Sequence, residues 1–236
     1  TRNMIPLEHY EITNNGITVP VSLEAYGSGF VVFSEGKSVE RKNIPATLEG
    51  AVYTASGLAA KTNSVASKTL DGPWEVRFEH RPGTPVTFSM DKLTSWHLLK
   101  DEAIKHFSGN GIYYKTFELS AAEARADGSV LLALNNVKEI AEVFLNGESV
   151  GYHWYPSNHL DITGRLEEGE NHLVISVVNS INNWLVGDAK KPKQYQQARS
   201  NISKLPNAWM TPFAAAPLIE AGLIGPVVLH WTKKYE

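Results

Sequence analysis

The sequence predicts an all-β protein, an antiparallel β-sandwich or jelly roll preceded by a short strand-rich segment. Its 18 glycines and 12 prolines often stand between short apolar runs, as the tight turns between many short strands require. Several of these runs alternate apolar with polar residues, which is the period of a half-buried strand. Two of them flank Asn146-Gly147, a dipeptide typical of a type I′ hairpin turn. These observations disfavour a helical protein.

The first 69 residues have the less defined pattern. Residues 17–33 contain an alternating run and then an apolar run, and both predict strands. Residues 34–68 are polar and small apart from 44–48 and 52–58, so they indicate a crossing between two sheet systems without a firm assignment. We therefore separate residues 1–69 as a strand-rich N-terminal segment that could be the end of a preceding β domain.

Residues 70–236 form the predicted jelly-roll domain. Trp74, Val76 and Phe78 alternate with charged residues, so they should lie on the buried face of a strand. Further strands are expected, in order, at residues 112–117, 130–134, 140–145, 149–152, 160–163, 172–179 and 226–231. Strands at this spacing are typical of two sheets packed face to face.

Three intervening segments should not be strands. Residues 95–107 predict a helical turn or a long loop, and residues 120–127, rich in Ala and Glu, predict one short helical turn. Residues 180–217 are polar and carry Trp184, Tyr195 and Trp209. Such a segment is usually functional or packs as a loop over a neighbour.

Composition narrows the range of partners. The 25 acidic and 22 basic residues are interspersed and give a formal net charge of −3, so no field exists to attract nucleic acid or anionic lipid. The absence of cysteine removes disulfides, thiol nucleophiles and zinc–thiolate sites. No apolar run approaches the roughly 20 residues of a membrane span. The first residues lack a signal-peptide pattern, so we expect a chain that is already processed or excised.

Five segments occur in an order that resembles one family. They are 107–117 (FSGNGIYYKTF), 141–147 (AEVFLNG), 160–163 (LDIT), 169–175 (GENHLVI) and 222–227 (GLIGPV). The series resembles the galactose-binding-like jelly roll of glycoside hydrolases. It looks most like the C-terminal β-sandwich of family 106 α-L-rhamnosidases, and secondly like the sugar-binding domain of family 2 enzymes.

The resemblance covers about two thirds of the chain and implies a carbohydrate setting. It also implies a multidomain parent, an O-glycosyl hydrolase that is secreted, periplasmic or on the cell surface. In such enzymes the main acid and base lie on a separate barrel domain. The expected partners are therefore carbohydrate and the catalytic domain of the parent hydrolase, without nucleic acid or membrane.

No complete catalytic site is expected in this chain. Glycoside hydrolysis needs two carboxyl groups, one with a raised pKa, and the candidates are Asp161 and Asp188; Asp161 is expected to cap a turn instead. Residues 26–30 (YGSGF) lack one residue of the serine-nucleophile pattern. The spacing of His153, His159 and Asp161 matches no tight zinc pattern. No cofactor is expected, although a structural calcium stays open.

Sugar binding needs an aromatic ring over the apolar face of a pyranose, flanked by amides and carboxylates that bind its hydroxyls. Residues 151–159 and 179–188 both offer this combination. The candidate carbohydrate-binding residues are Trp154, Tyr155, Asn158, His159, Asn183, Trp184 and Asp188. The two tryptophans could instead pack at an interdomain contact, because large rings dominate interfaces.

Three functional hypotheses remain. The first is a non-catalytic, carbohydrate-associated module of a secreted glycoside hydrolase, which supports the catalytic domain and contacts glycan. The second is a purely structural interaction domain without sugar affinity, which holds the catalytic domain through residues 212–223. The third is a part of an active glycosidase site that uses Asp161 or Asp188.

Overall fold

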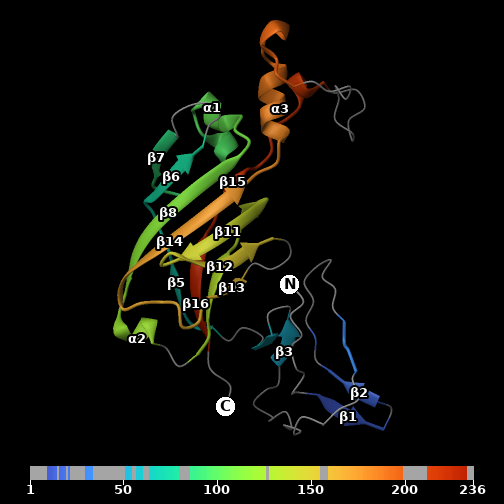
Figure 1. Cartoon of the computed structure of the whole chain (residues 1–236), viewed down its shortest axis with the longest axis vertical. Coiled ribbons are helices and arrows are strands. Elements are labelled where there is room, and N and C mark those ends of the chain that lie inside the picture. The colour runs from blue at the N-terminus through green and yellow to red at the C-terminus, as the bar shows by residue number, and fades with distance from the viewer. Residues whose placement is uncertain are drawn as a thin grey trace.

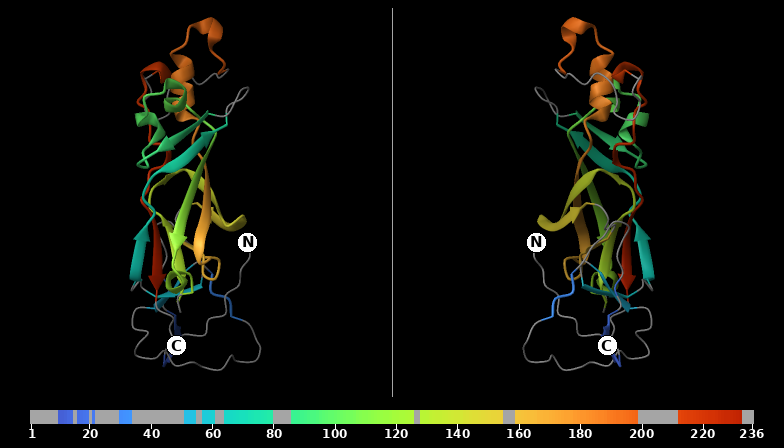
Figure 2. Two further views of the ribbon diagram at one scale, coloured as in Figure 1. Left: turned by 90° about the vertical axis from the view of Figure 1, so that its left-hand side faces the viewer. Right: turned by 90° about the vertical axis from the view of Figure 1, so that its right-hand side faces the viewer.

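A computed structural model describes residues 10–14, 16–19, 21, 30–33, 51–54, 57–60, 64–79, 86–125, 128–154, 159–198 and 212–232. Two antiparallel β-sheets dominate this part of the chain and lie as two layers over one core (Figure 1, Figure 2). The predicted antiparallel β-sandwich is therefore confirmed. Within the described ranges, no helix is both long and apolar enough to cross a membrane.

The larger sheet has six strands in the order β12-β11-β14-β8-β6-β7. In chain order these are β6 (Trp74–Phe78), β7 (Val86–Met90), β8 (Asn110–Leu119), β11 (Ile140–Leu145), β12 (Glu148–His153) and β14 (Gly169–Val178). The central strands β8 and β14 pair along all ten residues of each. Since side chains alternate across a strand, one face of this sheet is buried and the other points outward.

The smaller sheet has four strands in the order β13-β9-β16-β5. They are β5 (Ser64–Thr69), β9 (Val130–Leu134), β13 (His159–Asp161) and β16 (Val227–Thr232). Strand β5 lies in a segment for which the sequence pattern supports no firm assignment, and its pairing with β16 brings it into the sandwich. The division into residues 1–69 and 70–236 stays a prediction, with β5 on its N-terminal side.

The other elements are short. The paired ones are β1 (Glu11–Thr13) with β2 (Gly16–Thr18), β3 (Ala51–Thr54) with β4 (Gly57–Ala60), and β10 (Val137–Lys138) with β15 (Gly222–Leu223). The helices are η2 (Trp96–Leu98), α1 (Glu102–Lys105), α2 (Ala121–Ala124), α3 (Asn182–Ala189), η3 (Lys193–Tyr195) and η4 (Phe213–Ala215). The expected strand at 44–48 lies outside the described residues.

The core is made of side chains from the facing sides of both sheets. Trp74, Val76 and Phe78 are buried, as their alternation predicts, whereas the intervening Glu75 is exposed. The rings of Phe78 and Trp96 meet edge to face with their centroids 4.9 Å apart, an arrangement that aromatic pairs favour. The short helix η2 thereby places its tryptophan in the core of the sandwich.

The Tyr113 hydroxyl is a buried acceptor that joins three elements. It accepts a hydrogen bond from Trp96 Nε1 of η2 at 2.5 Å and another from the backbone N–H of Leu223 in β15 at 2.9 Å. Tyr113 itself belongs to β8, and burial raises the pKa of its phenol. These contacts fix η2 and β15 against the centre of the larger sheet.

The hairpin between β11 and β12 turns at Asn146-Gly147 as predicted. Both residues have positive φ, 51° and 84°, which a type I′ turn requires. The Asn146 side chain accepts from the backbone N–H of His172 and donates to Asn171 Oδ1. The turn is therefore held to the neighbouring strand β14 as well as to its own strands.

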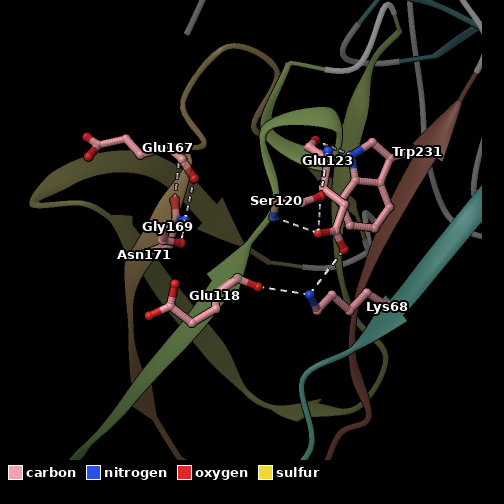
Figure 3. A network of polar contacts seen from close by, with 8 residues as sticks. All are labelled: Lys68, Glu118, Ser120, Glu123, Glu167, Gly169, Asn171 and Trp231. Carbon is pink, nitrogen blue, oxygen red and sulfur yellow. Dashed lines mark hydrogen bonds and ion pairs between the residues drawn. The ribbon is translucent and has the colours of Figure 1, made fainter.

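Polar side chains close the end of the sandwich near α2 (Figure 3). Lys68 of β5 donates to the Glu118 carbonyl and to the Glu123 carboxylate, at 2.8 and 3.1 Å. The same carboxylate accepts from the Ser120 backbone N–H, which completes a capping box at α2. Trp231 of β16 donates to the Glu123 carbonyl. Strands of both sheets therefore meet at one helical turn.

Replacing Glu123 with glutamine should lower the free energy of unfolding at neutral pH by about 1 kcal/mol or less, because both Lys68 and Glu123 are 36% exposed and solvent screens the pair. Hydrogen bonds from the Ser120 backbone and side chain, and then from Lys68, lower the pKa of Glu123 from 4.5 to about 2. Because the pKa of Glu123 is lower in the folded protein, its ionised carboxylate stabilises the fold above pH 4.5. This contribution to the free energy of unfolding is lost as pH falls toward 2.

Urea unfolding at pH 7 and pH 3 measures the effect. The difference between wild type and Glu123→Gln should shrink at the lower pH. A variant at the exposed Glu139, such as Glu139→Gln, serves as the control with no such network. An equal difference at both pH values would mean that the Glu123 charge plays no part.

Candidate functional site

A groove lies at the end of the sandwich where β8 begins and β14 ends. It encloses about 910 Å³ between α1, the first residues of β8 and α3, the two helices that stand beyond this end of the sheets (Figure 1). The side chains that line it include Glu79, Glu102, His106, Asn110, Trp184 and Lys190. Aromatic, amide, acidic and basic groups thus converge on one hollow.

Asn179, just after β14, holds two of the residues that line this groove, Phe107 and Gly109. Its side chain accepts from the Gly109 backbone N–H at 3.0 Å and donates to the Phe107 carbonyl at 2.9 Å. One amide therefore satisfies both a donor and an acceptor of the segment that leads into β8. The end of β14 and the start of β8 are held together by side-chain as well as backbone bonds.

Helix α3 forms the far wall, although the sequence predicts a loop over residues 180–217. The sequence signal for a helix is weak because its N-cap, Ile181, offers no side-chain hydrogen bond. Tertiary contact supplies the stability instead: Gly187 packs on the ring of His106, and a Cβ at Gly187 would lie 2.7 Å from the His106 side chain. Only glycine allows the two helices to approach so closely.

Two of the predicted sugar-binding residues hold this helix in place. Asn183 is buried, donates to the Ile219 carbonyl at 2.8 Å and accepts from the Ile219 N–H at 2.9 Å. Asp188 is 2% exposed and accepts from the backbone N–H groups of Gln197 and Ala198 and from Lys191. Their polar atoms already have protein partners.

Electrostatics in the groove favour ionised carboxylates. Burial acts to raise the pKa of Asp188, but hydrogen bonds from Ala198, Gln197 and Lys191 outweigh it and lower this pKa. The pKa of Glu102 is lowered first by its hydrogen bond to Lys105, and then by the charges of Lys105, His106 and Lys190. Neither group has the raised pKa of a glycosidase acid. The arrangement suits binding rather than proton donation.

The aromatic ring of the groove is open to a ligand, whereas Nε2 of the neighbouring His106 is buried. Trp184 is partly buried in α3 and lines the hollow, so part of its ring can contact a bound molecule. His106 donates through its Nδ1–H to the Glu102 carbonyl, whereas its buried Nε2 has no hydrogen-bond partner among the described residues. Such an unpaired buried atom is costly unless a partner binds it.

Trp154 and His159, from the other predicted segment, are not among the residues that line the groove. Trp154 directly follows β12 and is 67% exposed, and His159 is exposed on β13 with its ring 6.0 Å from that of His230. Tyr155 and Asn158 lie outside the described residues. The five predicted residues that the structure describes therefore divide between two places, and the assignment of all seven to sugar binding stays a prediction.

The histidines near β13 do not form a metal centre. Among the described residues, no group of three or more His, Asp or Glu side chains could hold a metal ion; His153, His159 and Asp161 are all described. His153 is buried, and burial followed by the neighbouring His159 lowers its pKa. His153 is therefore neutral at pH 7.

Sequence reasoning missed Glu79, Glu102, His106 and Asn110. They come from three separate segments: the pairing of β6 with β8 joins Glu79 to Asn110, and the docking of α1 against α3 adds Glu102 and His106. In the sequence, Asn110-Gly111 marks the start of a strand. No local sequence pattern indicates that Glu79, Glu102 and His106 lie near Asn110 in space. The one available signal is Gly187, a glycine between Val186 and Asp188.

Comparison with known proteins agrees with this fold. Residues 99–212 match the family model described as "Glycosyl hydrolase 2 galactose-binding domain-like". A curated relative from Formosa agariphila, named "Putative beta-glucuronidase", is 31% identical over 217 residues that cover 85% of this chain and 19% of the relative. A rhamnosidase structure from Novosphingobium sp. PP1Y is 30% identical with a TM-score of 0.58, over 75% of this chain and 16% of that one.

The chain thus contains a galactose-binding-like β-sandwich domain, and its residues 99–212 match the model of the corresponding domain of glycosyl hydrolase family 2. The resemblance drawn from the sequence motifs is confirmed. The chain spans less than a fifth of the length of both relatives.

Proposed function

We propose that this chain is a non-catalytic, carbohydrate-associated module of a secreted glycoside hydrolase, and that the groove beside Trp184 binds sugar. The observation that carries the proposal is the groove itself. It combines a partly exposed indole with an amide and ionised carboxylates. These are the groups that a pyranose needs, an apolar surface for its C–H face and polar atoms for its hydroxyls.

The family match supports a carbohydrate setting, and the lowered pKa values of Glu102 and Asp188 argue against a glycosidase acid in this groove. Secretion rests on the resemblance alone. The names of the two relatives suggest the first ligands to test, which are methyl glycosides of rhamnose and of glucuronic acid.

Replacing Trp184 with alanine should weaken sugar binding by about 5- to 150-fold, because stacking on one aromatic ring contributes on the order of 1–3 kcal/mol by analogy with base stacking. A glycan array that includes both methyl glycosides identifies a ligand. Its dissociation constant is then measured by titration followed by tryptophan fluorescence and by isothermal titration calorimetry. Tyr195→Ala is the control, since Tyr195 is exposed just beyond α3 and does not line the groove.

A structural module without sugar affinity is the second candidate. It is favoured by one observation, that Asn183 and Asp188 use their polar atoms in internal hydrogen bonds. A folded wild-type chain that binds no glycan on the array would overturn the sugar-binding proposal and leave this second function. Unchanged affinity in Trp184→Ala would place the sugar elsewhere.

A further inference from the structure

A row of outward-facing residues crosses the end of the larger sheet. Strand pairing sets Asn110 of β8 opposite Val178 of β14, and Val178 opposite Ile140 of β11. Trp154 follows His153, the partner of Ala141, and so lies beside Ile140. At the other end, the Glu79 backbone N–H donates to the Asn110 carbonyl. The row therefore runs Trp154, Ile140, Val178, Asn110, Glu79 over five strands.

This row connects two features that are far apart in the sequence. Its polar end, Asn110 and Glu79, lines the groove beside Trp184. Its apolar end is open to solvent, since Ile140, Val178 and Trp154 are all exposed. Four strand spacings separate its ends, which amounts to about 19 Å. That length exceeds what one sugar ring can cover.

The apolar end also has polar groups suited to hydroxyls. Tyr152 is 63% exposed and opposes Glu142 across the β11–β12 pair, and that carboxylate raises the pKa of its phenol. An indole, a phenol and a carboxylate thus stand together at the edge of the sheet. This repeats the combination of ring and carboxylate found in the groove.

We infer that the row is an extended binding track for an oligosaccharide, with one sugar in the groove and further residues of the same chain lying toward Trp154. The inference rests on the proposed sugar binding. The track crosses the strands at right angles on the face of the sheet, where the backbone groups of the central strands are already paired.

An extended peptide is a poorer occupant of this track. A peptide adds to a sheet by pairing with the open edge of a strand, and a peptide lying across the face would leave its own N–H and C=O groups without partners. An oligosaccharide has no such requirement, because hydroxyls that do not reach Asn110, Glu79 or Glu142 stay in water.

The test is the dependence of affinity on chain length. The probes are the size-fractionated oligosaccharides of the glycan with the strongest array signal, from the methyl glycoside as the shortest to a several-residue oligomer as the longest. We expect the dissociation constant to fall at least tenfold between the shortest and the longest probe. Trp154→Ala and Tyr152→Ala should each remove most of this gain, and Tyr195→Ala should keep it.

The outcomes separate the two proposals. No binding of any probe would sink the sugar-binding function and the track together. Binding of equal strength at every length, or a length-dependent gain that survives in Trp154→Ala, would overturn the track and leave the groove as a site for a single sugar. Far-ultraviolet circular dichroism confirms that each surface variant is folded.

Discussion

Replacing Tyr113 with phenylalanine is expected to lower the free energy of unfolding by about 2–6 kcal/mol, because two buried donors lose their acceptor at a cost of about 1–3 kcal/mol each. The donors are Trp96 Nε1 and the Leu223 N–H, and both residues are fully buried. The ring of Tyr113 can stay in place, so the loss comes from the hydroxyl rather than from a cavity. Urea unfolding followed by tryptophan fluorescence measures it.

Tyr114→Phe provides the matched control for this experiment. Tyr114 is the next residue on β8 and faces outward, partly exposed, without a hydrogen bond to the described residues through its hydroxyl. Its variant should keep wild-type stability within about 0.5 kcal/mol, as surface substitutions usually do. Equal stability of the two variants would show that the Tyr113 hydroxyl does not hold η2 and β15 to the sheet.

The sandwich could be predicted because its strands carry their pattern locally. Trp74, Val76 and Phe78 alternate with charged residues, and Asn146-Gly147 has the two residues that best tolerate positive φ. Strand β5, with the sequence SVASKT, has no such pattern. It is a strand because β16 pairs with it, and that information is distant in the sequence.

The groove could be predicted only in part. Residue type alone points to Trp184, and Trp184 does line the groove. The same reasoning selects Asn183 and Asp188, yet their amide and carboxylate bond to the backbone of distant segments. Residue type shows that a side chain can bind a hydroxyl, but it does not show whether the protein itself already occupies that side chain.

Gly222 belongs to one of the motifs that led to the family, and the structure supplies its physical reason. The residue has a φ of 91°, and a Cβ there would overlap the indole of Trp96. The backbone of β15 therefore lies directly against the core tryptophan. This approach also brings the Leu223 N–H to the Tyr113 hydroxyl.

Gly222→Ala is accordingly expected to cost about 2–6 kcal/mol, the sum of about 1–3 kcal/mol for a non-glycine residue at positive φ and about 1–3 kcal/mol for overpacking. Gly147→Ala separates the two contributions, because Gly147 has a similar φ of 84° in the hairpin turn but an added Cβ there would meet no atom within 4 Å. The Gly147→Ala variant should therefore lose only the free energy that a non-glycine residue costs at positive φ. Thermal unfolding of the two variants side by side measures the difference.

If Gly147→Ala proves as destabilising as Gly222→Ala, the contact between Gly222 and Trp96 contributes nothing and backbone strain explains the whole loss.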